Sequence, residues 1–181
     1  NSGSEGAGIT SAEQIQGKEL SYNNIADTDA AIECVSNFEK PSCVIVKHAN
    51  PCGVASGKTL LEAYEKAFSC DETSAFGGII ALNKALDKVT AKKIIDNQFV
   101  EVIAAPAINP AAKKIIATKK NVRLLLIKDL FQKPTGFKTL TMNQGILVQN
   151  VDDGAVSKKD LKVVTKKKPT SKQVNDALFA W

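Results

Sequence analysis

The chain has 181 residues, of which 44% are hydrophobic, and a formal net charge of +5. This length suits one domain of ordinary size, which buries roughly 68–70% of the surface of its unfolded chain. No apolar run approaches the roughly 20 residues of a membrane-spanning helix, and the start lacks the apolar core of a secretion signal, so we expect a cytoplasmic protein that does not act in a membrane.

The N-terminal part predicts a leader followed by a helix. Residues 1–16 are mostly Ser, Gly, Ala and polar types, which favours a flexible leader with order from near Leu20. The stretch Asp27–Asp29 precedes apolar residues at helical spacing. It therefore predicts a helix that begins at a carboxylate cap.

An apolar stretch over residues 42–47 predicts a buried strand. Asn50 and Pro51 are expected to end it, because proline has no amide proton and pushes the preceding residue toward extended geometry. Gly53 can supply the positive φ that a tight turn often needs.

Strand and helix patterns then alternate as far as residue 127. Helical spacing covers 60–68, 90–99 with Thr90 as a cap, and 110–120, and apolar runs cover 79–82, 100–105 and 122–127. Strands that alternate with helices of this length imply crossover connections and parallel pairing. The predicted fold is therefore α/β with three layers and a mostly parallel central sheet.

The pattern changes beyond Lys128. Residues 137–142 alternate and 145–149 form a short apolar run with no helix between them, which predicts an added antiparallel pair. Thr170 or Ser171 can cap a final helix.

Charge and cysteine usage narrow the ligand classes. Arg123 is the only arginine, and the lysines of 158–168 have no interleaved aromatic side chain to stack on bases, so we expect a solvated lysine face and no nucleic-acid binding. The cysteines contain no Cys-x-x-Cys pair, which favours free thiols and no metal site. They are Cys34, Cys43, Cys52 and Cys70.

The only histidine, His48, follows Lys47 where the strand over 42–47 is expected to end. Imidazole has an unperturbed pKa of about 6.5 and can exchange protons near neutral pH. Adjacent strand residues point to opposite faces, so the two side chains reach one ligand only if the strand has ended or bulged there. The alternative is a surface lysine beside a core histidine that caps a turn.

Five motifs resemble, in this order, the transformylase half of the bifunctional purine biosynthesis family that pairs aminoimidazole carboxamide ribotide (AICAR) transformylase with inosine monophosphate (IMP) cyclohydrolase. They are Lys47–Gly53, Ser74–Gly78, Val102–Pro106, Gly145–Gln149 and Asp176–Trp181. The resemblance runs from about Gly17 to Trp181 and implies the first of two related subdomains with a cytidine deaminase-like fold. It places that subdomain at 17–168 and makes 169–181 the start of a helix that leads into a second subdomain.

The resemblance implies transfer of a formyl group from 10-formyltetrahydrofolate to the exocyclic amine of AICAR, in a homodimer that needs no metal. His48 would accept the amine proton and Lys47 would stabilise the transition state. Gly77 would approach the nucleotide through its backbone, with Phe76 as a neighbouring wall and Glu101 as a carboxylate for the ribose hydroxyls. Gly78, Asn50 and Asn24 complete the implied substrate-binding set.

Each of these residues also has a structural alternative. Gly77 and Gly78 permit a turn or close packing between layers, Glu101 is a solvated charge at a strand start, and Asn24 is a turn asparagine. The zinc signature of the deaminases is absent, because no Glu stands two residues after His48 and Pro51-Cys52 lacks a second cysteine.

The chain lacks the family's Arg-Tyr-Gly-Glu-Asn-Pro-His-Gln stretch, its second subdomain and its cyclohydrolase domain. We therefore expect these 181 residues alone to fold but to turn over little substrate. Two other functions stay open: a non-catalytic nucleotide- or phosphate-binding module that uses Lys47 and the glycine turns, and a nucleic-acid binder that uses 158–168, whose affinity would fall steeply with salt.

Overall fold

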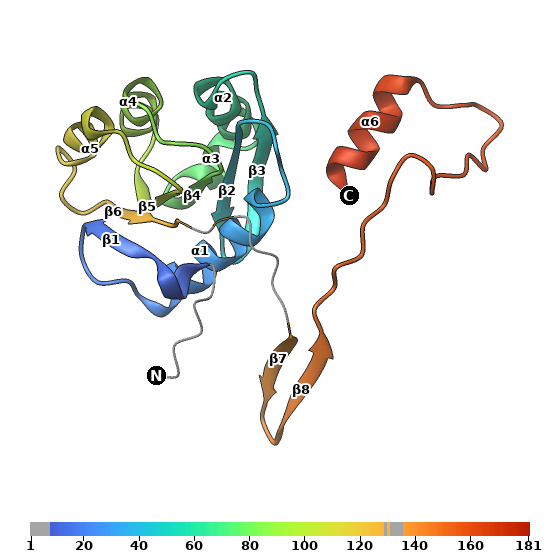
Figure 1. The fold of residues 1–181 in the computed structure, drawn as a ribbon, viewed down its shortest axis with the longest axis horizontal. Coiled ribbons are helices and arrows are strands. Elements are labelled where there is room, and N and C mark those ends of the chain that lie inside the picture. Colours follow the sequence, from blue (N-terminus) through green and yellow to red (C-terminus); the bar gives the residue numbers. More distant parts are fainter. Residues whose placement is uncertain (1–7, 129, 131–135) are drawn as a thin grey trace. The chain divides into compact units, whose positions relative to one another are not determined.

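The computed structural model describes residues 8–128, 130 and 136–181 (Figure 1). The chain divides into two compact units, Asn1–Lys133 and Pro134–Trp181. The boundary between the units falls inside residues 17–168. The assignment of this whole range to one subdomain therefore stays a prediction.

The first unit is built on a six-stranded sheet with the order β1-β6-β5-β4-β2-β3. Its strands are β1 (Glu13–Gln16), β2 (Ser42–Lys47), β3 (Asn50–Ser56), β4 (Gly78–Leu82), β5 (Val100–Ala105) and β6 (Arg123–Leu126). The pairs β4–β5 and β5–β6 are parallel, and β2 is antiparallel to both β3 and β4. β3 therefore runs in the same direction as β4, β5 and β6, which confirms the α/β class with a mostly parallel sheet.

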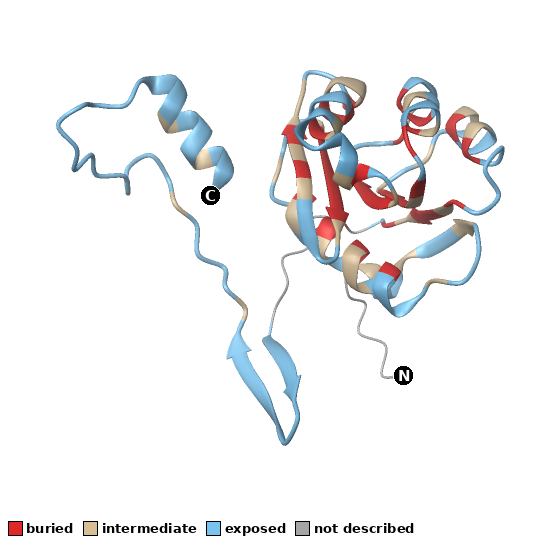
Figure 2. Cartoon of the chain, turned by 180° about the vertical axis from the view of Figure 1, so that it is seen from behind, coloured by how far each residue is buried: buried red, intermediate tan, exposed pale blue. Residues whose placement is uncertain are grey.

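Helices cover both faces of this sheet and give the predicted three layers (Figure 1). α1 (Tyr22–Val35) packs on one face, and α2 (Leu60–Cys70), α4 (Lys88–Asn97) and α5 (Pro110–Ile116) pack on the other. The buried residues lie along the strands and on the inner sides of these helices (Figure 2). The core thus consists of two apolar layers separated by the sheet.

Two helices begin earlier than the sequence predicted. α1 starts after Ser21, whose hydroxyl accepts the Asn24 amide in a capping box, so Asp27 lies inside the helix. The N-cap of α4 is Asp87, and Thr90 is its third residue. A short helix, α3 (Glu72–Ala75), was not predicted.

Part of the expected leader is ordered. After the short 3-10 turn η1 (Ile9–Ser11), β1 pairs antiparallel with β6. The side-chain amide of Gln16 donates to the carbonyls of Ile116, Lys119 and Val122 at 3.1–3.2 Å. The prediction of a flexible leader is therefore wrong over 9–16, and residues 1–7 lie outside the described residues.

The strand β2 covers residues 42–47, as predicted, but Asn50 and Pro51 do not end it, because they belong to β3. His48 and Ala49 form a two-residue turn, both with φ of 57°, and lead into β3. Pro51 pairs with Val46 at a register shift of the ladder, where a proline is tolerated. Gly53 has no positive φ: a Cβ there would overlap the carbonyl oxygen of Ala67 in α2.

The second unit contains β7 (Phe137–Met142), β8 (Gly145–Asn150) and α6 (Ser171–Ala180). The strands β7 and β8 pair antiparallel, which confirms the added pair, and Thr170 caps α6 with a capping box to Gln173. Almost all of the described residues of this unit are exposed (Figure 2). None of the described helices, in either unit, is long and apolar enough to cross a bilayer.

Candidate functional site

The residues singled out in the sequence meet at one edge of the sheet. Because β2 is antiparallel to β4, its last residue, Lys47, lies near the first residues of β4. Glu101 and Arg123 stand at the starts of β5 and β6, on the same edge. Ligands of open parallel sheets usually bind at the carboxyl ends of the strands, whereas this cluster lies at the amino ends of β4, β5 and β6.

Lys47 is half-buried, and its ammonium points at the end of α3. The Nζ atom donates to the carbonyl oxygen of Phe76 at 2.9 Å. Hydrogen bonds from the hydroxyl and amide of Ser74 hold the pKa of Asp71 below its usual value, and the charge of Lys47 adds a smaller contribution in the same direction. An ammonium has three N–H donors, so the bond to Phe76 leaves capacity for a ligand.

His48 is exposed and lies outside the strand. The alternative of a core histidine is therefore wrong. With a φ of 57°, its backbone has left the extended geometry that forces neighbouring side chains to opposite faces. Asn50 serves the same turn, since its side-chain amide donates to the carbonyl of His48 at 2.9 Å.

The segment Phe76–Gly78 connects α3 to β4. Gly77 has a φ of 75°, a conformation that favours glycine, and its amide donates to the carbonyl of Phe99 at 2.8 Å. Gly78 is buried, and a Cβ there would lie 3.1–3.2 Å from the Ala75 oxygen and the β2 backbone and side chains. Gly77 thus serves a turn and Gly78 close packing, so both structural alternatives for these glycines are present.

The Phe76 ring is exposed and stacks obliquely on Phe99, with ring centroids 5.6 Å apart. A cavity of about 540 Å³ opens beside this pair, and Asn97, Lys119 and Asn121 also line it. Of the site residues predicted from the sequence, only Phe76 reaches this cavity. Phe76 thus lines this cavity, while Lys47 and His48 lie outside it.

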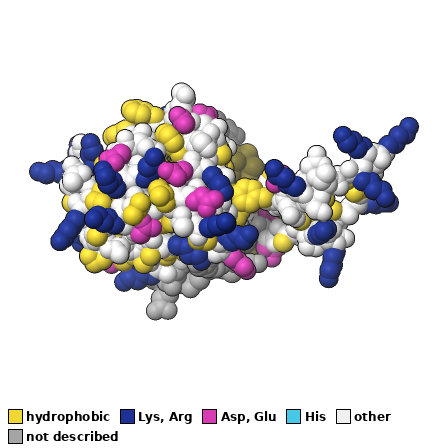
Figure 3. All heavy atoms as spheres, turned by 90° about the horizontal axis from the view of Figure 1, so that it is seen from above, with side chains coloured by type: hydrophobic (Ala, Val, Ile, Leu, Met, Phe, Trp, Pro, Cys, Tyr) yellow, Lys and Arg dark blue, Asp and Glu magenta, His cyan; other side chains and the backbone are white. Residues whose placement is uncertain are grey.

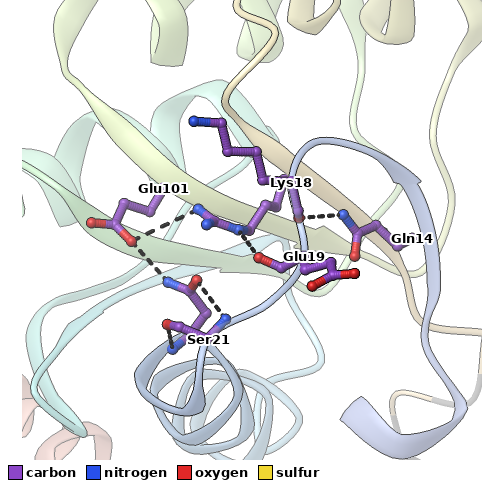
Figure 4. A network of polar contacts seen from close by, with 7 residues as sticks. Gln14, Lys18, Glu19, Ser21 and Glu101 are labelled. Atoms are coloured by element: carbon purple, nitrogen blue, oxygen red, sulfur yellow. Dashed lines mark hydrogen bonds and ion pairs between the residues drawn. The ribbon is translucent and has the colours of Figure 1, made fainter.

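Glu101 and Asn24 are joined directly. The Asn24 side-chain amide donates to Glu101 Oε2 at 2.8 Å, and the same oxygen lies 3.9 Å from the Arg123 guanidinium (Figure 4). Arg123 Nε in turn donates to the carbonyl of Glu19 at 3.0 Å. Glu101 is thus held in a network, and Arg123 is a member that the sequence gave no reason to place there.

The sequence matches the family model described as the AICARFT/IMPCHase bienzyme over residues 1–181. The chain belongs to this family. Its members pair AICAR transformylase with IMP cyclohydrolase, so the chain has its role in purine biosynthesis.

The four cysteines carry free thiols. Burial raises the pKa of the Cys43 and Cys34 thiols, while Cys70 is exposed. Within 8–128, 130 and 136–181, the structure shows no group of three or more His, Cys, Asp or Glu side chains arranged to hold a metal ion.

The lysines of 158–168 lie on exposed loop in the second unit. On the face that Figure 3 draws, lysine and arginine side chains are scattered over both units. Within that unit, Lys162, Lys167 and Lys168 line a cavity together with residues of α6.

Removing the Asn24 side chain is expected to destabilise the protein. Asn24→Ala breaks the capping box of α1 and the hydrogen bond to Glu101, so the free energy of unfolding should fall by about 1–2 kcal/mol. Chemical denaturation measures this change. Asn23→Ala, at the exposed neighbouring position, is the control, and equal stability of the two variants would contradict the prediction.

Proposed function

We propose that the chain carries the proton-transfer part of the transformylase site, which moves a formyl group from 10-formyltetrahydrofolate to the exocyclic amine of AICAR and yields formylated AICAR. The observation that carries this proposal is the pairing of an exposed imidazole with an adjacent lysine at the tip of the β2–β3 hairpin. Backbone held at positive φ in residues other than glycine is costly and tends to occur at functional sites.

The chemistry needs a base and a cation. The exocyclic amine of AICAR is a poor nucleophile because its lone pair is delocalised into the ring and the carboxamide. A base must remove its proton as it attacks the formyl carbon, and a positive group must stabilise the oxyanion that forms there. In this proposal His48 is the base and Lys47 stabilises the oxyanion.

The neighbouring residues bind the nucleotide in the same proposal. Phe76 forms an apolar wall beside the nucleotide, and the backbone of Gly77 lies close to it. Gly78 completes this segment. Glu101, with Asn24 behind it, presents a carboxylate to the ribose hydroxyls. This assignment is supported by the position of these residues at the same edge of the sheet. Asn50 contributes by holding the hairpin turn through its hydrogen bond to the carbonyl of His48.

We further propose that the active protein is a cytoplasmic homodimer that uses the folate as co-substrate and needs no metal. The 181-residue chain alone should show little turnover, because residues that the family supplies from other segments would be missing. The non-catalytic nucleotide-binding module remains the alternative function.

A direct assay tests the proposal. The natural protein that contains this sequence is mixed with 10-formyltetrahydrofolate and AICAR, and released tetrahydrofolate is followed by absorbance while mass spectrometry detects the formylated product. We expect product in amounts equal to the tetrahydrofolate released. AICAR binding measured by calorimetry, without any formyl transfer, would contradict the proposal and favour the nucleotide-binding module.

A further inference from the structure

Asp27 of α1 contacts the hairpin tip through both oxygens of its carboxylate. Oδ2 accepts the amide of His48 at 3.2 Å, and Oδ1 accepts the amide of Ala49 at 2.7 Å. One side chain thus binds two consecutive backbone amides of the turn, from a position 21 residues earlier in the chain.

These two amides belong to residues in an unfavourable conformation. Both His48 and Ala49 have a φ of 57°. A two-residue hairpin turn with two positive φ angles normally contains Asn or Gly, because a Cβ is crowded in that conformation. Neither His48 nor Ala49 is one of those two residue types. Hydrogen bonds to an ionised carboxylate are about twice as strong as neutral ones, so Asp27 supplies stabilisation that the turn sequence lacks.

The carboxylate itself is held in place by the core. α1 buries Thr28, Ala31 and Val35 on the inner side of the helix. One turn before Asp27, Asn24 binds Glu101 at the start of β5. The helix therefore fixes the hairpin tip and the β5 end of the candidate site from a single rigid element.

We propose that Asp27 is a positioning residue for the formyl transfer proposed above: by binding the two amides it fixes the turn and with it the direction of the His48 imidazole relative to Lys47. The inference rests on the proposed function. It differs from a direct chemical role, in which the carboxylate itself would exchange a proton or orient the substrate.

The test uses Asp27→Asn in the active protein. Asparagine keeps one acceptor oxygen but places an NH₂ donor against the other backbone amide. We expect kcat to fall by about 10- to 100-fold, the loss typical of a displaced catalytic group. The KM for AICAR should change by less than about twofold, because Phe76, Gly77 and Glu101, which are proposed to bind the nucleotide, lie outside the hairpin.

A second substitution separates positioning from direct chemistry. Ala49→Gly removes the crowded Cβ, so the turn can keep its positive φ without the carboxylate. In the Asp27→Asn background it should restore kcat by about tenfold. A loss of kcat that Ala49→Gly leaves unchanged would overturn the positioning role.

The matched control is Asp87→Asn. Asp87 also binds a backbone amide, that of Thr90 at 2.8 Å, but it caps α4 after the far end of β4. Asparagine caps helices as well as aspartate does, so this variant should retain the kcat of the parent protein.

Hydrogen–deuterium exchange gives a readout that does not depend on activity. Peptides that cover the hairpin should exchange at least about tenfold faster in Asp27→Asn than in the parent, and unchanged exchange would overturn the inference. If the parent transfers no formyl group, the proposed function fails, while this measurement still decides whether Asp27 holds the turn. Should Asp27→Asn not fold, Asp27→Glu, which keeps the charge but displaces the carboxylate, takes its place, and parent-like exchange and kcat in that variant would likewise overturn the inference.

Discussion

His48→Ala is expected to lower kcat for formyl transfer by about 100- to 10,000-fold, the usual contribution of a general base. AICAR should still bind, because the imidazole is proposed to act on the amine proton rather than to hold the nucleotide. The backbone should tolerate this change, since the next residue is already an alanine with the same φ of 57°. Steady-state kinetics and calorimetric titration with AICAR measure the two quantities.

Lys47→Ala separates catalysis from simple anion binding. If the ammonium stabilises the oxyanion, kcat should fall by about 100-fold or more. Lys88→Ala, at an exposed position on α4, is the matched control. A protein in which Lys47→Ala abolishes AICAR binding, and whose parent shows no formyl transfer, would be a binding module instead. Full activity in His48→Ala would also contradict the assigned roles.

Gly53→Ala should cause the largest loss of stability. A Cβ at this position overlaps the carbonyl oxygen of Ala67 and lies 2.9 Å from its carbonyl carbon. The obstacle is the backbone of α2, which cannot rotate away as a side chain can. We expect the free energy of unfolding to fall by about 3 kcal/mol, at the upper end for overpacked sites.

Gly145→Ala is the control for this substitution. Its Cβ would meet no atom within 4 Å, and its φ is not positive. Its effect should stay within about 0.5 kcal/mol, as for most surface changes. Denaturant titration of both variants gives the comparison, and similar unfolding midpoints would show that β3 and α2 do not approach so closely at Gly53.

The elements predicted from periodicity are those with a continuous apolar pattern. Strands β4, β5 and β6 and helix α2 lie within two residues of their predicted positions, and α5 begins at Pro110 as predicted but ends at Ile116, because burial against the sheet fixes their pattern. Strand β3 was missed because Pro51 argues against a strand. It is nevertheless accommodated, since β3 is an edge strand with a register shift opposite the proline.

The candidate site was only partly visible in the sequence. The family resemblance named Lys47, His48 and Glu101, but the turn that carries His48 has no Asn-Gly signal. Its stabilising group, Asp27, lies 21 residues away, and the Asn24–Glu101 hydrogen bond spans 77 residues. Local sequence patterns carry no information about such long-range partners, which depend on how α1 packs on the sheet.

The positive φ of His48 also limits how mutagenesis at this position can be interpreted. β-Branched side chains fit that conformation poorly, whereas glycine and asparagine accept it. A saturation library at position 48 should therefore yield folded but inactive clones enriched in those two residue types, while valine, isoleucine and threonine clones would lose the fold of the hairpin as well as the imidazole. Asparagine is thus an informative replacement for separating the chemistry of the imidazole from the shape of the chain that carries it.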